Sequence, residues 1–222
     1  MPKSVYFSGL DLGQQQDYSA LVVVEQLPSS DGLLHSYAVR HLHRWPLGTS
    51  YPTIVEHLDK MYSASAALVD TTLIIDATGV GRPVVDMVTA AKIMAVMKPM
   101  SITAGMKPGA GTVPKKDLVG AVQTALQTRR LKIASGLPLA DTLAKELEMF
   151  RVKVTADRNE TFASWRERDH DDLVLALALA VWYGEKRPGN SADCFSRPEP
   201  YQPGIDPLTG LPASIWGPAR RY

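Results

Sequence analysis

Carboxylates stand at three points of the sequence where their positions could bring them to one metal ion. Asp11 and Asp76 each end an apolar run, residues 5–10 and 73–75, and the run Asp169-His170-Asp171-Asp172 opens an apolar segment. Apolar runs of this kind are typical of buried strands, and a charge at the end of such a strand is unfavourable unless it is paired or binds a metal. The residue types therefore predict a divalent-cation site built from carboxylate oxygens, which suit Mg²⁺ or Mn²⁺.

The elements that would position these acids follow from the hydrophobic pattern. Periodicity and turn residues predict strands at 5–11, 20–27, 34–45, 73–76, 93–102 and 131–134, helices at 52–62, 82–91, 114–127, 137–150 and 173–182, a loop at 105–111, and a hairpin that pairs 151–155 with 161–165. The first three strands are joined by hairpin-type connections, and helices alternate with strands afterwards. This order predicts a mixed α/β sheet, with three antiparallel strands and then parallel strands, covered by helices on both faces.

Composition indicates one globular domain with an extension. The chain has 222 residues, 45% of them apolar and 21% charged, and a formal charge of +1. These values exclude a globally basic nucleic-acid-binding protein. The single cysteine, Cys194, excludes an intrachain disulfide and a cysteine-rich zinc site. We expect one domain over residues 1–186 and a Pro- and Gly-rich tail over 187–222, which could lie on its own domain or dock to a partner.

The ordered set of elements and acids resembles the nuclease domain of phage terminase large subunits, which has a ribonuclease H-like fold of the RuvC-like superfamily. The resemblance covers about residues 4–186. The residues that carry it are Gly9-Leu10-Asp11-Leu12-Gly13 with Asp17-Tyr18-Ser19-Ala20 after it, Ile75-Asp76-Ala77-Thr78-Gly79-Val80-Gly81, Lys115-Lys116-Asp117-Leu118, and His170-Asp171-Asp172-Leu173-Val174-Leu175-Ala176-Leu177-Ala178.

The resemblance implies a metal-dependent DNA endonuclease that cuts concatemeric viral DNA during genome packaging, in the cytoplasm of the host cell. The sequence contains no Gly-x-x-x-x-Gly-Lys-Ser/Thr loop, so the ATPase motor of a full terminase subunit would reside elsewhere, whether this chain is an excised domain or a separately encoded nuclease. The expected partners are double-stranded DNA, the terminase ATPase motor, the small terminase subunit and the portal protein. No secretory signal and no apolar stretch of bilayer length is found, so no membrane partner is expected.

The requirements of phosphodiester hydrolysis suggest a role for each acid. Two cations about 4 Å apart can activate water and neutralise the charge on the phosphate. Asp11 is expected to bridge the two ions, Asp76 to hold one and Asp172 the other, with water as the nucleophile. On a helix, Asp169 would share the face of Asp172, whereas Asp171 would point about 100° away. The predicted catalytic residues are therefore Asp11, Asp76 and Asp172, with Asp171 as a further metal ligand.

Four auxiliary residues are predicted around these acids, namely Asp17, Asp169, Lys115 and Lys116. Asp17 follows the first strand and could support the carboxylate cluster, although an aspartate in a turn often bonds to its own backbone. The two lysines could contact a DNA phosphate or belong to the solvated start of a helix.

Structural roles stay open for the acids too. Asp169 and Asp171 could stabilise the dipole of the following helix. Asp76 could accept hydrogen bonds from the backbone amides of Thr78 or Gly79.

Other functions remain as alternatives. A RuvC-like Holliday-junction resolvase would cut four-way junctions as a dimer. The Gly9-to-Gly13 segment also resembles the first phosphate loop of actin-like ATPases and sugar kinases, but a second Asp-x-Gly-Gly-type loop and a second large domain are missing from the sequence. A non-enzymatic packaging or scaffold module would need no converging acids.

Overall fold

A mixed seven-stranded sheet is the framework of the part of the chain that the computed structural model describes, residues 5–13, 17–27, 34–68, 71–78, 81–104, 109, 111–156 and 171–186. Its strands are β1 (Val5–Asp11), β2 (Ala20–Leu27), β3 (Ser36–Arg44), β4 (Thr72–Asp76), β5 (Val96–Thr103), β6 (Thr112–Pro114) and β7 (Leu131–Ile133). The helices are α1 (Tyr51–Ala64), the short 3₁₀ helix η1 (Ala66–Leu68), α2 (Gly81–Ala90), α3 (Lys115–Gln127), α4 (Ala140–Ala156) and α5 (Asp172–Lys186).

The strand order is β6-β5-β4-β1-β2-β3-β7, so the first strand of the sequence lies at the centre of the sheet. β1, β2 and β3 pair antiparallel, whereas β4 pairs parallel to β1, β5 to β4, and β6 to β5. The carboxyl ends of β1, β4, β5 and β6 therefore meet at one edge of the sheet. The predicted α/β sheet, with three antiparallel strands and then parallel ones, is confirmed.

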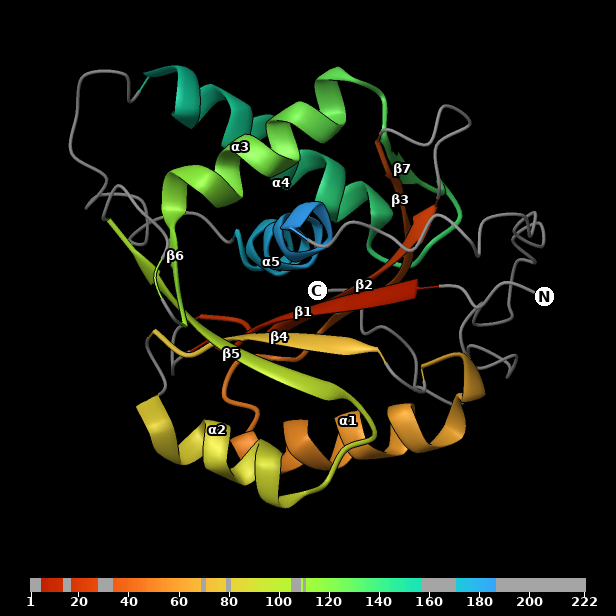
Figure 1. Cartoon of the computed structure of the whole chain (residues 1–222), viewed down its shortest axis with the longest axis vertical. Coiled ribbons are helices and arrows are strands. Elements are labelled where there is room, and N and C mark those ends of the chain that lie inside the picture. Colours follow the sequence, from red (N-terminus) through yellow and green to blue (C-terminus); the bar gives the residue numbers. More distant parts are fainter. Residues whose placement is uncertain are drawn as a thin grey trace.

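Helices cover both faces of the sheet, with α1 and α2 on one side and α3, α4 and α5 on the other (Figure 1). Each side has its own apolar core, because successive strand residues point to opposite faces. On β1, Phe7 belongs to the core beneath α5 and Leu10 to the core beneath α1. On β4, Ile74 faces α5 while Leu73 and Ile75 face α1.

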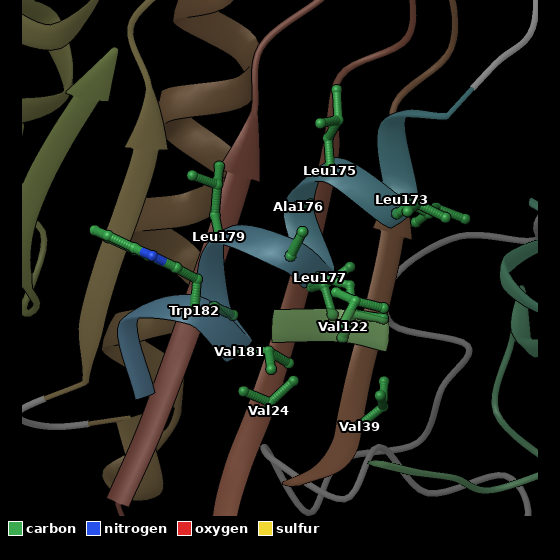
Figure 2. Packing of buried hydrophobic residues seen from close by; sticks show 14 of the residues in the cluster. Val24, Val39, Val122, Leu173, Leu175, Ala176, Leu177, Leu179, Val181 and Trp182 are labelled. Atoms are coloured by element: carbon green, nitrogen blue, oxygen red, sulfur yellow. The ribbon is translucent and has the colours of Figure 1, made fainter. Parts of the chain in front are cut away.

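Helix α5 packs directly on the central strands, as its almost wholly apolar sequence predicts. Every residue from Leu173 to Trp182 is buried. Figure 2 shows this helix crossing the strands above Val24 and Val39, with Val122 of α3 close to it. At Gly9 the helix comes so near to β1 that a Cβ atom would collide with the Ala176 carbonyl. A residue with a side chain at position 9 could not support this packing.

The direction of α5 follows from two close approaches to the sheet. Ala176 lies against Gly9, whereas Gly184, two turns later, lies against Phe7 and Tyr37. The helix therefore runs antiparallel to β1, and its first residue, Asp172, lies towards the edge where β1 ends at Asp11.

Three sequence predictions need correction. The strand predicted at 151–155 is wrong, because these residues continue α4 to Ala156. Alternating valines at 152 and 154 produced the strand pattern, but a formed helix extends with one new hydrogen bond per residue. The predicted partner segment, 161–165, lies outside the described residues. Strand β6 was not predicted, because three residues carry too little periodicity to identify a strand.

The third correction concerns the start of α5. The described helix begins at Asp172, and the backbone carbonyl of Asp171 accepts a hydrogen bond from the Leu175 amide at 2.9 Å. Asp171 is thus the residue before the first helical turn, so the predicted rotation of 100° does not apply to it. Asp169, His170 and the tail at 187–222 lie outside the described residues. None of the described helices has both the length and the apolar character needed to cross a membrane.

Candidate metal site

Asp11 and Asp76 end neighbouring parallel strands and point to the same face of the sheet. The register pairs Leu10 with Ile75, so Asp11 and Asp76 are the next residues on β1 and β4. Side chains two residues apart on a strand point to the same face of the sheet. Gly9 contacts α5, and Ile74 belongs to the core beneath α5, so Asp11 and Asp76 both point to the α5 side. Both residues are buried, at 8% and 4% exposure. Sequence and sheet together bring these two predicted ligands side by side.

The carboxylate of Asp76 is oriented by the residues that follow β4. Its Oδ1 accepts hydrogen bonds from the backbone amide of Thr78, at 2.8 Å, and from the Thr78 hydroxyl. Thr78 Oγ1 in turn accepts a hydrogen bond from the Ile102 amide of β5, at 2.7 Å. The structural role predicted for Asp76 is therefore present, and it fixes the carboxylate in place at the edge of the sheet. Gly79 lies outside the described residues.

Asp172 approaches the same edge from the first turn of α5, and two residues that sequence analysis missed surround it. Arg44, the last residue of β3, forms an ion pair with Glu146 of α4, and its Nη2 lies 3.5 Å from Asp172 Oδ2. Glu146 Oε2 accepts a hydrogen bond from the Val174 amide of α5, at 3.3 Å. The Arg44 guanidinium also lies over the ring of Tyr18, 5.0 Å from its centroid.

Sequence signals for these two residues exist but are faint. Glu146 falls on the buried side of α4 between Leu143 and Leu147, where an acid is unusual. Arg44 ends a strand whose preceding residue on the same face, Leu42, is buried in the core beneath α5. The contact between Arg44 and Glu146 joins residues 102 positions apart, which no local pattern reveals.

The electrostatics of this region favour an added cation. Burial is the largest cause that raises the pKa of Asp172 to about 7; Arg44 opposes the shift, and the negative charges of Glu146 and Asp171 add to it. Burial also raises the pKa of Glu146, against the influence of Arg44. Among the described residues, one arginine, Arg44, is paired with Glu146 and Asp172, and Asp171 adds a third negative charge beside them. The described part of this region therefore carries excess negative charge when all three acids are ionised.

The predicted auxiliary residues that the structure describes are Lys115, Lys116 and Asp17. Lys115 and Lys116 begin α3 directly after β6, whose carboxyl end lies at the same edge of the sheet as those of β1 and β4. Asp17 is exposed in the connection between β1 and β2. No side-chain contact described for Asp17 links it to the acids, so its auxiliary role remains a prediction.

The predicted ligands form two neighbouring groups. Asp11 and Asp76 form one, and Asp171 and Asp172 form the other beside Arg44. Among the described residues, no three His, Cys, Asp or Glu side chains are close enough to share a metal ion.

The chemistry of the donors nevertheless fits a hard cation. The predicted ligands are all carboxylates, which are the preferred donors of Mg²⁺ and Mn²⁺. Asp172 Oδ2 is buried and accepts no hydrogen bond from the described part of the chain, and its only described cationic neighbour, Arg44, lies 3.5 Å away. The oxygen can therefore still serve as a ligand to a cation.

Comparisons with known proteins identify the family and the fold. The sequence matches the family described as "Terminase RNaseH-like domain" over residues 8–183. No curated protein sequence matches the chain. The structure is similar to the large terminase nuclease from thermophilic phage G20c, solved with bound zinc, with 23% identity, a TM-score of 0.50 and 81% of each chain covered. It is also similar to the manganese-soaked human cytomegalovirus terminase nuclease domain, with 10% identity, a TM-score of 0.53, and 85% of this chain and 87% of that chain covered. These similarities show the RNase H-like fold.

Proposed function

Because the chain belongs to the terminase RNase H-like domain family, we propose that it is a metal-dependent endonuclease that cuts double-stranded DNA. The observation that carries the proposal is the placement of Asp11 and Asp76 at adjacent strand ends on the α5 side, with the first turn of α5 directed to the same edge. Carboxylates at adjacent strand ends can hold a divalent cation next to a bound phosphate.

In this proposal the acids act as metal ligands. Asp11, Asp76 and Asp172 are the catalytic residues, and Asp171 is a further ligand. Two Mg²⁺ or Mn²⁺ ions would supply water activation and neutralise the charge that develops on the phosphate. Thr78 holds the Asp76 carboxylate in one orientation, so its oxygens need little reorganisation to bind.

DNA is proposed to bind through its phosphates across this edge of the sheet. Lys115 and Lys116 begin α3 at the same edge of the sheet as the acids, where they can contact DNA phosphates beside the cleavage site. A protein that binds mainly to phosphates reads little sequence and loses affinity as salt rises. The biological substrate is proposed to be concatemeric viral DNA in the host cytoplasm, with the terminase ATPase motor, the small terminase subunit and the portal protein as partners.

The experiment that tests this function is cleavage of supercoiled plasmid, linear plasmid and a four-way junction with Mn²⁺, Mg²⁺ or EDTA. Wild-type protein is compared with Asp11→Asn, Asp76→Asn and Asp172→Asn, and with Asp59→Asn as a matched control, because Asp59 is exposed on α1 across the sheet. We expect metal-dependent cutting of both plasmid forms by wild type and control, with a loss of at least about a hundredfold in the other three variants.

Two outcomes would overturn the proposal. Folded wild-type protein that neither cuts DNA nor binds metal by calorimetry would exclude a metal-dependent nuclease. Cutting confined to the four-way junction would point to a resolvase instead.

A further inference from the structure

Arg44 reaches the first turn of α5 along one row of the sheet. Asp11 of β1 pairs with Ala20 of β2, and Ala20 pairs with Arg44 of β3. Neighbouring strands are about 4.8 Å apart, so Arg44 and Asp11 are separated by about two strand spacings. Ala20, between them, is fully buried in the core beneath α5. A permanent cation thus stands close to the proposed metal ligands.

A permanent cation at this position would compete with a metal ion. An arginine binds carboxylates through a planar fork of donors and never loses its charge. If Arg44 paired fully with Asp172, the carboxylate would be occupied and its charge already neutralised. The proposed role of Asp172, which rests on the proposed function, therefore requires something that limits this pairing.

Glu146 provides that limit. The same Arg44 Nη2 that lies 3.5 Å from Asp172 Oδ2 makes its hydrogen bond to Glu146 Oε1 instead. Asp172 Oδ2 is left buried with no hydrogen bond from the described part of the chain. The second oxygen of Glu146 is fixed by the Val174 amide, so the acceptor cannot drift from Arg44 without losing a bond to α5. Both Glu146 and Arg44 are shielded, with side chains 7% and 14% exposed.

We propose that Glu146 is a positioning residue that binds Arg44 and thereby keeps the Asp172 carboxylate available to the metal ion. Arg44 partly neutralises the acids when no metal is bound, and Glu146 prevents it from capturing Asp172. The role of Glu146 is exerted through Arg44, so it disappears when Arg44 is absent.

The test is a double-mutant comparison of Glu146→Gln, Arg44→Met and the double variant, with Glu148→Gln as control, because Glu148 is exposed on the same helix. Glutamine keeps the size of Glu146 and an oxygen for the Val174 amide but removes the charge that holds Arg44. Mn²⁺ affinity is measured by calorimetry, and the Mn²⁺ concentration for half-maximal plasmid cleavage is measured beside kcat at saturating Mn²⁺.

We expect Glu146→Gln to weaken Mn²⁺ binding by about tenfold, the lower range for residues that support a metal ligand, while kcat at saturating Mn²⁺ stays within about threefold. Arg44→Met should bind Mn²⁺ at least as tightly as wild type. The double variant should regain the affinity of Arg44→Met, because Arg44 can no longer capture Asp172. A purely structural role for Glu146 predicts the opposite, a double variant at least as impaired as Glu146→Gln.

The inference is overturned if Glu146→Gln binds Mn²⁺ like wild type, if the double variant is no better than Glu146→Gln, or if Arg44→Met alone weakens Mn²⁺ binding. The last comparison does not need Glu146→Gln to fold. Failure of the proposed function is distinct, since the wild-type protein itself would then neither bind Mn²⁺ nor cut DNA.

Discussion

At the scale of single residues, the site depends on how each carboxylate is held. Asp76 is oriented by Thr78, whereas Asp172 is buried beside Arg44 with one oxygen that accepts no hydrogen bond from the described residues. An oriented, hydrogen-bonded carboxylate is ready to bind a cation, while a buried one with a raised pKa must first lose its proton. The two acids should therefore respond differently to mutation and to pH.

Mn²⁺ binding should depend on the protonation of Asp172. Its pKa is raised to about 7, so the group is mostly protonated at pH 6 and mostly ionised at pH 8. Because the metal binds the ionised form, we expect affinity to rise by about tenfold from pH 6 to pH 8, as measured by calorimetry. An affinity that stays constant over this range would contradict metal binding by an Asp172 carboxylate of raised pKa.

The same pKa shift predicts how stability depends on pH without metal. The folded pKa of Asp172 lies above the ordinary value of 3.8, so the folded state holds more protons than the unfolded state between about pH 4 and pH 7. The contribution of this group to the free energy of unfolding is therefore fully present below pH 4 and is lost as pH rises to about 7. In EDTA, Asp172→Asn should show a smaller fall in Tm from pH 5 to pH 8 than wild type, whereas Asp59→Asn should match wild type. An equal fall in Tm from pH 5 to pH 8 in all three proteins would contradict the raised pKa of Asp172.

Thr78→Val should test the orientation of Asp76. The substitution keeps the shape and the backbone amide but removes the hydroxyl that bonds to Asp76 and accepts from Ile102. We expect a loss of stability of about 1–2 kcal/mol by chemical denaturation. Mn²⁺ affinity should fall by about tenfold. Thr89→Val, which removes an exposed hydroxyl bonded to the Val85 carbonyl, serves as control and should leave Mn²⁺ binding unchanged.

At the scale of elements, α5 is the part that places Asp172, and its position depends on Gly9. Gly9→Ala puts a methyl group where the Ala176 carbonyl lies, and both partners are backbone, so one element must move. We expect a loss of about 1–3 kcal/mol or more of stability, together with weaker Mn²⁺ binding. Gly120→Ala in α3, where an added Cβ meets nothing within 4 Å, should instead stabilise by about 0.5–1 kcal/mol. Equal effects of the two substitutions would contradict the described packing.

The elements also show what sequence could predict. Strands β1 and β2 were predicted with the bounds found, because each is an apolar run closed by turn residues. β6 was missed because it is three residues long and depends on pairing with β5. The pairing of Arg44 with Glu146 was missed for a different reason, since it joins β3 to α4 across the fold. Local patterns predict buried strands and the acids that end them, but not the partners that tertiary packing supplies.

At the scale of the whole molecule, one edge of the sheet combines the acids proposed as metal ligands with the basic residues Lys115 and Lys116. The formal charge of +1 provides no general attraction for DNA, so the proposed DNA binding must depend on a local group of basic residues. We expect affinity for a short duplex to fall steeply with salt. Lys115→Ala combined with Lys116→Ala should lower the slope of log affinity against log salt by about 1 for each phosphate that the variant no longer binds. Lys60 is exposed on α1, across the sheet from the acids, so Lys60→Ala should leave this slope unchanged. An unchanged slope in the Lys115 and Lys116 variant would place the DNA elsewhere.

The most direct test of the metal site is anomalous diffraction from crystals soaked in Mn²⁺. We expect two manganese ions at the shared edge of β1, β4 and α5, one bound by Asp11 and Asp76 and the other by Asp11 and Asp172, so that no ion needs three of the acids. The same crystals of Asp11→Asn should lose this signal. Manganese bound away from these acids, or no manganese in crystals that remain ordered, would contradict the claim that they form the metal site.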